Sequence, residues 1–355
     1  MTRERIMTLR SLVCASACLA LSVAAGCGGD DDNGPDATPG GSVDSMPIHT
    51  ADGMPGGSDD GMPDDGNATF TVTWDPITVG SGQENTQCVV KKLGNSERIY
   101  VDSVHNVLGQ GSHHMIVYKV SDTEERPDQF DCQPFTDALT KGGAPIVISQ
   151  KADDLLTLPD GVAFNIAPDQ MIRIELHYIN TSDADETIQA STTFHTVPAA
   201  EVEDEAGFVF MGTANIDLPP HQMTTVGPVY FPLQKTGLDD AHFFAITGHT
   251  HKLGLDVQVA TAPSEGGADT PVYDVENFNW DEPATIFYND APFQVPADGG
   301  FRFSCDYNNT TDSPVSFGES TKEEMCFFWA YYYPSEGSKL CIDYPGTGPI
   351  CVDAN

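Results

Sequence analysis

Four histidines occur in two pairs whose spacing suits metal binding. His113 and His114 are adjacent at the start of the apolar run SHHMIVYKV, and His249 and His251 are one residue apart in GHTHKLG. Side chains two residues apart project from the same face of a strand, so His249 and His251 can reach a single ion. Adjacent side chains diverge in a regular strand. His113 and His114 can therefore converge only at a strand end or a bulge, which the preceding Gly111 permits.

A fifth histidine lies in the strand-like segment MIRIELHYIN. Its alternation places four apolar side chains on one face, Ile172, Ile174, Leu176 and Tyr178. The opposite face then carries His177 together with Arg173 and Glu175, so we expect His177 to point away from its own core. Each of these histidine motifs is a weak sign of a metal site when taken alone. The combination of all three predicts a metal centre, because coincidence explains the set poorly.

The elements that must position these residues are short strands. After residue 67 the sequence consists of β-branched and aromatic runs separated by Gly, Pro, Asn and Asp, and no long segment has a 3.6-residue apolar period. This pattern predicts an all-β fold, and the number of runs favours two tandem antiparallel jelly-roll β-sandwich domains over one. The acidic connector VPAAEVEDEAG is the natural boundary. We therefore expect an N-terminal domain at residues 67–198 and a C-terminal domain at residues 199–355.

The first 26 residues have the features of a signal peptide. Arg3, Arg5 and Arg10 precede the run SLVCASACLALSVAAG, which is too short to span a bilayer comfortably. The stretch SVAAGC resembles a bacterial lipobox, which implies cleavage before Cys27 and lipidation of that cysteine, in preference to a plain secretory signal or a membrane helix. We therefore expect an exported protein anchored by lipid to the bacterial envelope, at the outer membrane, on its periplasmic or cell-surface face.

Residues 27–66 form an acidic Gly/Asp/Pro segment with almost nothing to bury, so they predict a disordered tether. Two sharper interpretations concern sets of side chains within it. Asp30, Asp31, Asp32 and Asp36 could hold Ca²⁺, but no closing Glu follows at the right distance, so a solvated charge run is favoured. Met46, His49, Met54 and Met62 could bind Cu(I), although ordinary linker composition is favoured.

Charge and cysteine content exclude some partners and constrain the covalent structure. The chain has 16 Lys and Arg against 53 Asp and Glu, a formal charge of −37 that disfavours nucleic acid as a partner. Export implies an oxidising compartment, where cysteines pair. Six cysteines remain after the signal peptide and Cys27 are set aside: Cys88, Cys132, Cys305, Cys326, Cys341 and Cys351. They allow three disulfides in any of about 15 patterns.

The ordered motifs SHHM, IELHY, GHTHKLG and EEMCFFWAYYY together resemble a known enzyme family. It is the copper type II, ascorbate-dependent monooxygenases, which include peptidylglycine alpha-hydroxylating monooxygenase and dopamine beta-monooxygenase. The likeness extends over residues 70–335. It implies two copper ions, held in two jelly-roll domains that face each other across a solvent-filled gap.

The resemblance also implies roles for individual residues. His113, His114 and His177 would form the electron-donating copper site, and His249, His251 and Met325 the catalytic copper site where dioxygen binds. Two imidazoles and one thioether suit Cu(I) with an open position, whereas three imidazoles suit a copper that cycles between oxidation states. The implied disulfides are Cys88–Cys132, bracing the strand that leads to His113, and Cys305–Cys326. Cys341–Cys351 follows by elimination.

The implied activity is hydroxylation of a substrate C–H bond with O2 and a one-electron donor such as ascorbate. We expect a monomer acting on a small molecule or a peptide. Thr247 and Trp329 replace the arginine and tyrosine of the peptide-amidating relatives, which argues against a peptide C-terminus. Two alternatives remain open. The chain could be a non-catalytic copper-binding surface lipoprotein that retains the fold and the ligands, or a structural double jelly roll without metal.

Overall fold

The computed structural model describes residues 67–133, 143–234 and 236–354. These residues belong to one compact unit, Gly61–Asn355. Among them, no helix combines the length and the apolar character that crossing a bilayer requires. The predicted signal peptide (1–26), the lipidation site Cys27 and the predicted tether (27–66) lie outside the described residues.

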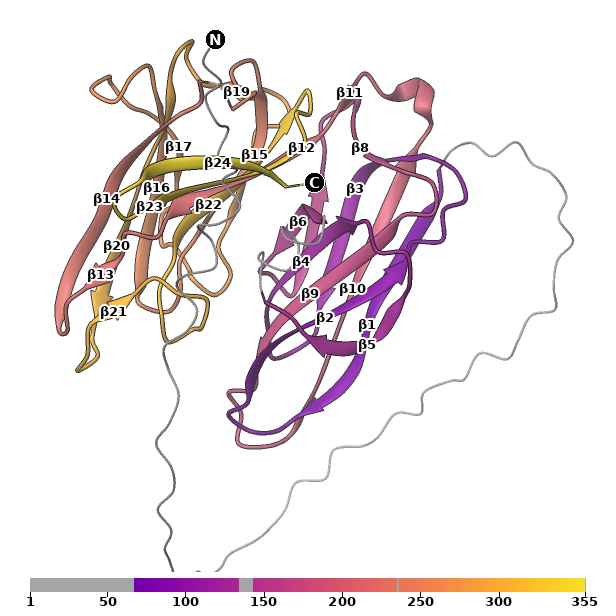
Figure 1. Ribbon diagram of the computed structural model, residues 1–355, viewed down its shortest axis with the longest axis horizontal. Helices are drawn as coiled ribbons and strands as arrows, with labels where there is room; N and C mark the ends of the chain where they lie inside the picture. Colours follow the sequence, from indigo (N-terminus) through magenta and orange to yellow (C-terminus); the bar gives the residue numbers. More distant parts are fainter. Residues whose placement is uncertain (1–66, 134–142, 235, 355) are drawn as a thin grey trace, which may run out of the picture. The chain divides into compact units, whose positions relative to one another are not determined.

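Strands β1 to β11 form two sheets, which we call the first sandwich (Figure 1). One sheet has the order β1-β10-β3-β8-β11, with β7 also paired to β3, and the other has the order β5-β2-β9-β4-β6. Their bounds are β1 Thr69–Val79, β2 Glu84–Lys92, β3 Ile99–Leu108, β4 Ser112–Val120, β5 Arg126–Asp131, β6 Gly143–Ser149, β7 Asp153–Thr157, β8 Val162–Ile166, β9 Met171–Ile179, β10 Glu186–Val197 and β11 Asp204–Glu205. The short 3-10 helix η2, Ala199–Glu201, precedes β11.

Strands β12 to β24 form the second sandwich. One sheet has the order β18-β15-β22-β12-β23-β24, with β19 also paired to β15; the facing sheet is β14-β20-β16-β17, and β13 pairs with β21. Their bounds are β12 Gly207–Thr213, β13 Asp217–Leu218, β14 Gln222–Pro232, β15 His242–His249, β16 Gly254–Ala262, β17 Thr270–Asp274, β18 Thr285–Phe287, β19 Phe293–Gln294, β20 Gly300–Asn309, β21 Val315–Ser316, β22 Cys326–Tyr333, β23 Ser338–Tyr344 and β24 Gly348–Ala354. The predicted all-β class is confirmed. The jelly-roll connectivity and the division at residue 198 remain predictions.

Strand β9 shows how the sequence alternation becomes packing. Ile172, Ile174 and Leu176 lie in the core of the first sandwich, as their period of two predicts. The polar face is buried as well, since Arg173 and Glu175 are only 2% and 1% exposed. This face is enclosed because neighbouring side chains cover it, including that of Tyr118, whose hydroxyl donates to Glu175 at 2.9 Å.

The sheet of the second sandwich that contains β22 is buried on both faces. Along β22, Phe327, Trp329 and Tyr331 join the core cluster of the first sandwich, whereas the intervening Phe328 and Tyr332 join the core of the second. Both faces are therefore apolar, which explains why CFFWAYYY is continuously hydrophobic instead of alternating. The two sandwiches are also joined by polar contacts. The backbone N–H of Ile148 donates to the Tyr331 hydroxyl at 3.2 Å, and the Ser338 hydroxyl donates to the Pro145 carbonyl at 2.7 Å.

The described residues include three disulfides, Cys88–Cys132, Cys305–Cys326 and Cys341–Cys351. They are the pairs expected from the sequence. Cys88–Cys132 joins β2 to the residue that follows β5, so it braces the neighbour of β9 and not the strand β4 that carries His113. Cys305–Cys326 links β20 to β22 across the core of the second sandwich and ends beside Met325. Cys341 and Cys351 are directly opposite in the antiparallel pair β23–β24.

Candidate metal centre

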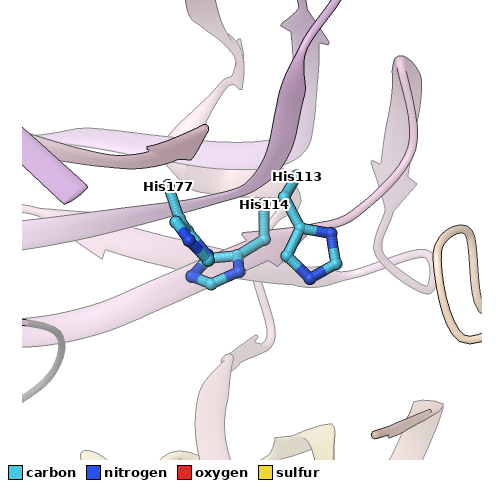
Figure 2. A group of neighbouring side chains, drawn as sticks. All are labelled: His113, His114 and His177. Atoms are coloured by element: carbon cyan, nitrogen blue, oxygen red, sulfur yellow. The ribbon is translucent and has the colours of Figure 1, made fainter. Parts of the chain in front are cut away.

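His113, His114 and His177 lie together where β4 begins beside β9 (Figure 2). His114 is the register partner of His177, and the register shifts between Ser112 and His114, so the backbone is irregular at His113. This irregularity lets two adjacent side chains converge, as the sequence requires. One potential ligand atom from each histidine lies within 4.8 Å of the others. The ring centroids are 5.0 to 5.4 Å apart.

The hydrogen bonds of these three histidines leave nitrogen atoms free for a metal ion. His177 Nε2 is 3.0 Å from a carboxylate oxygen of Glu84, which orients the ring and leaves Nδ1 facing inward. His113 Nε2, His114 Nδ1 and His177 Nδ1 are buried and have no hydrogen-bond partner among the described residues. Three unpaired nitrogens in one buried cluster are costly unless an ion binds them. The donor set therefore fits copper, for which imidazole is a common ligand.

Electrostatics favour the neutral form that metal binding requires. Burial, together with the neighbouring His113, lowers the pKa of His177 to about 4, although Glu84 opposes the shift. Burial also lowers the pKa of His114 well below its ordinary value, with added repulsion from His177. Neutral imidazoles offer a lone pair without first losing a proton, so the site is ready to bind metal at pH 7.

His249 and His251 come from the end of β15 and the residues that follow it, with ring centroids 5.3 Å apart. His249 Nδ1 lies 2.7 Å from the side-chain oxygen of Gln150, and His251 Nδ1 lies 2.9 Å from the carbonyl of Glu323. Each contact fixes one ring nitrogen as a donor. His251 Nε2 is buried without a partner among the described residues. Burial lowers the pKa of His251 to about 4 and that of His249 well below its ordinary value.

Met325 is held next to these histidines by the residues that precede it. The fully buried Glu324 accepts the backbone N–H of His251 at 2.9 Å and of Leu253 at 2.8 Å. The hydroxyl of Tyr307 donates to the Met325 carbonyl at 2.6 Å. The segment EEM thus ties the Met325 backbone to the turn that carries His251. Glu324 is part of the motif recognised in the sequence, but its role is visible only in the structure.

Replacing Glu324 with alanine is expected to destabilise the protein by about 2–4 kcal/mol, since it leaves two buried N–H groups without an acceptor. Denaturant unfolding of the metal-free protein measures the change. Glu323→Ala is the matched control. It removes the same type of side chain from an exposed neighbour and keeps the carbonyl that accepts from His251. Equal stability of the two variants would contradict the role of Glu324 as the buried acceptor of the two backbone N–H groups.

A small cavity connects parts of both histidine groups. His114, His249 and Met325 line it, together with the apolar side chains of Ile116, Ile148, Phe210 and Trp329 and the polar side chains of Gln150 and Glu319. The space inside it that water can reach is about 20 Å³, which is room for about one water molecule, and the cavity is partly open to solvent.

The two groups face each other closely. The ring centroids of His113 and His251 are 6.3 Å apart, and those of His114 and His249 are 6.4 Å apart. The resemblance implied a solvent-filled gap between the two domains that carry these groups. The structure differs here because the apolar face of the β22 sheet packs against the first sandwich and brings the histidines together.

Comparison with known proteins found a family model that matches part of the chain. Residues 204–346 match the family model described as copper type II ascorbate-dependent monooxygenase, C-terminal domain. The matched segment contains His249, His251 and Met325. The match supports this family, a copper-dependent chemistry and an oxidoreductase of the monooxygenase type.

Solved structures of viral proteins share little with the chain. A protein of Sulfolobus turreted icosahedral virus is 8% identical, with 72% of this chain and 59% of that chain covered and a TM-score of 0.18. The chain therefore spans less than two thirds of that protein. A protein of infectious bursal disease virus strain Gx is 10% identical, with 80% and 75% covered and a TM-score of 0.20. Neither similarity bears on function.

Sequence reasoning missed the residues that orient the histidines. Glu84, Gln150 and Asp281 each contact a ring nitrogen of a candidate ligand, at 3.0, 2.7 and 3.5 Å. None of them belongs to a histidine motif or has a diagnostic spacing. The only signal available was chemical, because ligating histidines usually have a carboxylate or carbonyl partner on the second ring nitrogen.

Proposed function

We propose that the protein is a copper monooxygenase that inserts one oxygen atom of O2 into a substrate C–H bond. Two observations support this proposal, of which the first is the family match over residues 204–346. The second, which carries it, is the cluster of three buried imidazole nitrogens that lack partners among the described residues. A donor set of this kind has no structural use that the fold reveals, whereas it suits copper.

The proposed ligands form two sets. His113, His114 and His177 would hold one copper ion, and His249, His251 and Met325 would hold a second. Copper supplies one-electron redox chemistry and activation of O2 when it is bound. The overall reaction consumes two electrons and two protons from a reductant of the ascorbate type. It converts C–H and O2 into C–OH and water.

The residues of the chain would hold and shield the substrate. Ile116, Ile148, Phe210 and Trp329 give the cavity apolar walls, which would favour an apolar substrate portion. None of the described lining residues is a lysine or an arginine, so a carboxylate would find no cationic partner there. Thr247 does not compensate, because it is buried and shares a hydrogen bond with Thr285 at 2.8 Å. We therefore propose an apolar substrate without a carboxylate at the reacting end.

The proposal also includes the cellular setting. We propose that a lipid on Cys27 anchors an exported monomer to the bacterial envelope, with residues 27–66 as the tether. Nucleic acid is not proposed as a partner, because a formal charge of −37 opposes binding to phosphate.

The test is substrate-dependent oxygen uptake by the purified protein with Cu(II) and ascorbate, followed by mass spectrometry of products formed under ¹⁸O2. We expect two coppers per chain and one labelled oxygen atom in the product. Copper binding without oxygen uptake across apolar, amine and peptide substrates would favour the non-catalytic copper-binding lipoprotein. Failure to bind copper at all would exclude both functions and support a structural role.

A further inference from the structure

Asp281 reaches from the second sandwich to a histidine of the first. It lies between β17 and β18, and its Oδ1 is 3.5 Å from Nδ1 of His113, a close contact that is longer than an ordinary hydrogen bond. The His113 side chain is 2% exposed, whereas that of Asp281 is 62% exposed, so the carboxylate lies at the rim and the ring lies inside. The contact leaves His113 Nε2 directed away from Asp281.

Gln150 makes the reverse connection, from the first sandwich to the second. Its side-chain oxygen is 2.7 Å from Nδ1 of His249, and its side-chain NH2 donates to the Trp280 carbonyl at 3.2 Å. Trp280 precedes Asp281, and its ring lies 5.6 Å from that of His113, centroid to centroid. One amide thus orients a histidine of the second group and holds the loop that contacts the first group.

Glu84 makes a third connection. Its Oε1 lies 3.0 Å from His177 Nε2 and also accepts the backbone N–H and the hydroxyl of Thr321, at 3.2 and 3.0 Å. Thr321 is four residues before Met325 and belongs to the second sandwich. The acceptor that orients His177 is therefore itself held by the segment that leads to the thioether.

We propose that Asp281, Gln150 and Glu84 are positioning residues through which each sandwich orients metal-binding histidines of the other. An acceptor on one ring nitrogen selects the tautomer whose other nitrogen can bind metal. Asp281 and Gln150 lie across the interface from the histidines that they contact, and Glu84 is held by Thr321 from across it. Tight copper binding by each group should therefore depend on contact between the two sandwiches. Copper should in turn strengthen that contact, since such coupling is reciprocal. This inference rests on the proposed function, because it takes the two histidine groups to be copper sites.

The experiment compares Asp281→Ala with Glu282→Ala in the full chain. Both replacements remove one negative charge from neighbouring exposed residues, and only Asp281 contacts His113. We expect Asp281→Ala to lower the affinity for one of the two copper ions by about tenfold or more, measured by competition with a chelator. Loss of such a partner lowers metal affinity by about 10–100-fold. We also expect it to change the Cu(II) EPR spectrum. Glu282→Ala should match the wild type in both measurements.

A conservative variant separates orientation from charge. Asp281→Asn keeps a side-chain oxygen that can accept from His113, so it should recover most of the affinity and the wild-type spectrum. Gln150→Leu should weaken the copper at His249, whereas Gln150→Glu, which keeps an acceptor oxygen, should not. Equal copper affinity and equal spectra for Asp281→Ala and Glu282→Ala would overturn the inference.

The measurements also separate this inference from the proposed function, because they use Cu(II)-loaded protein without turnover. A wild type that consumes oxygen, with Asp281→Ala unchanged, refutes only the positioning role. A wild type that binds copper without turnover, with Asp281→Ala weakened, refutes only the monooxygenase. A wild type that binds no copper refutes both.

Discussion

Met325→Ile is expected to lower substrate-dependent oxygen uptake by more than about 100-fold while the copper held by His113, His114 and His177 remains bound. Loss of a residue that merely supports a ligand costs about 10–100-fold, so loss of the thioether ligand itself should cost more. Isoleucine has a similar volume, and Met325 is only 8% exposed, so packing should be largely preserved. Oxygen-electrode assays and copper analysis of the same sample give the two readouts.

Two variants make the Met325 result specific. Met223→Ile changes an exposed methionine, 60% accessible, and should leave uptake and copper content unchanged. Met325→Leu fills the same space with another non-ligating side chain and should behave like Met325→Ile. Full turnover in either Met325 variant would refute the assignment of the oxygen-binding copper to this residue.

His177→Ala is expected to remove one copper per chain and to reduce steady-state oxygen uptake by more than about 100-fold. The reason is that His177 is the register partner of His114 and supplies one of three buried nitrogens, so its loss leaves two ligands for that ion. Copper content, measured after removal of weakly bound metal, and the Cu(II) EPR spectrum report the loss.

His221→Ala serves as the control for His177→Ala. His221 has a side chain that is 63% exposed and pairs with Asp312 on the surface, far from any cluster of histidines in the sequence. This variant should retain copper and activity. Unchanged copper content in His177→Ala would show that the three-histidine site is assigned wrongly.

Much of the fold follows from local patterns. Short β-branched runs predicted an all-β protein, and the alternation of β9 placed Ile172, Ile174 and Leu176 in the core. The same alternation predicted a polar face but not its burial. Whether Arg173 and Glu175 meet water depends on segments that cover the sheet from elsewhere in the chain, which a period of two cannot reveal.

The candidate site was predictable in its ligand types and not in its surroundings. The doublet at His113 required a backbone irregularity, and β4 has one beside His177. Glu84 and Thr321, by contrast, are 237 residues apart, and their contact exists only because the sandwiches meet. The same applies to the close approach of His114 to His249, which depends on packing between two sheets and not on any local spacing.

The sheet that contains β22 is buried on both faces, and this affects whether the two sandwiches can be produced as separate fragments. A fragment that begins after residue 198 would present Phe210, Trp329 and Tyr331 to water, because their packing partners would be missing. Exposed aromatic surface of this kind promotes aggregation. Each sandwich thus needs the other to cover its apolar surface. Truncation is therefore a poor route to studying either proposed copper site by itself.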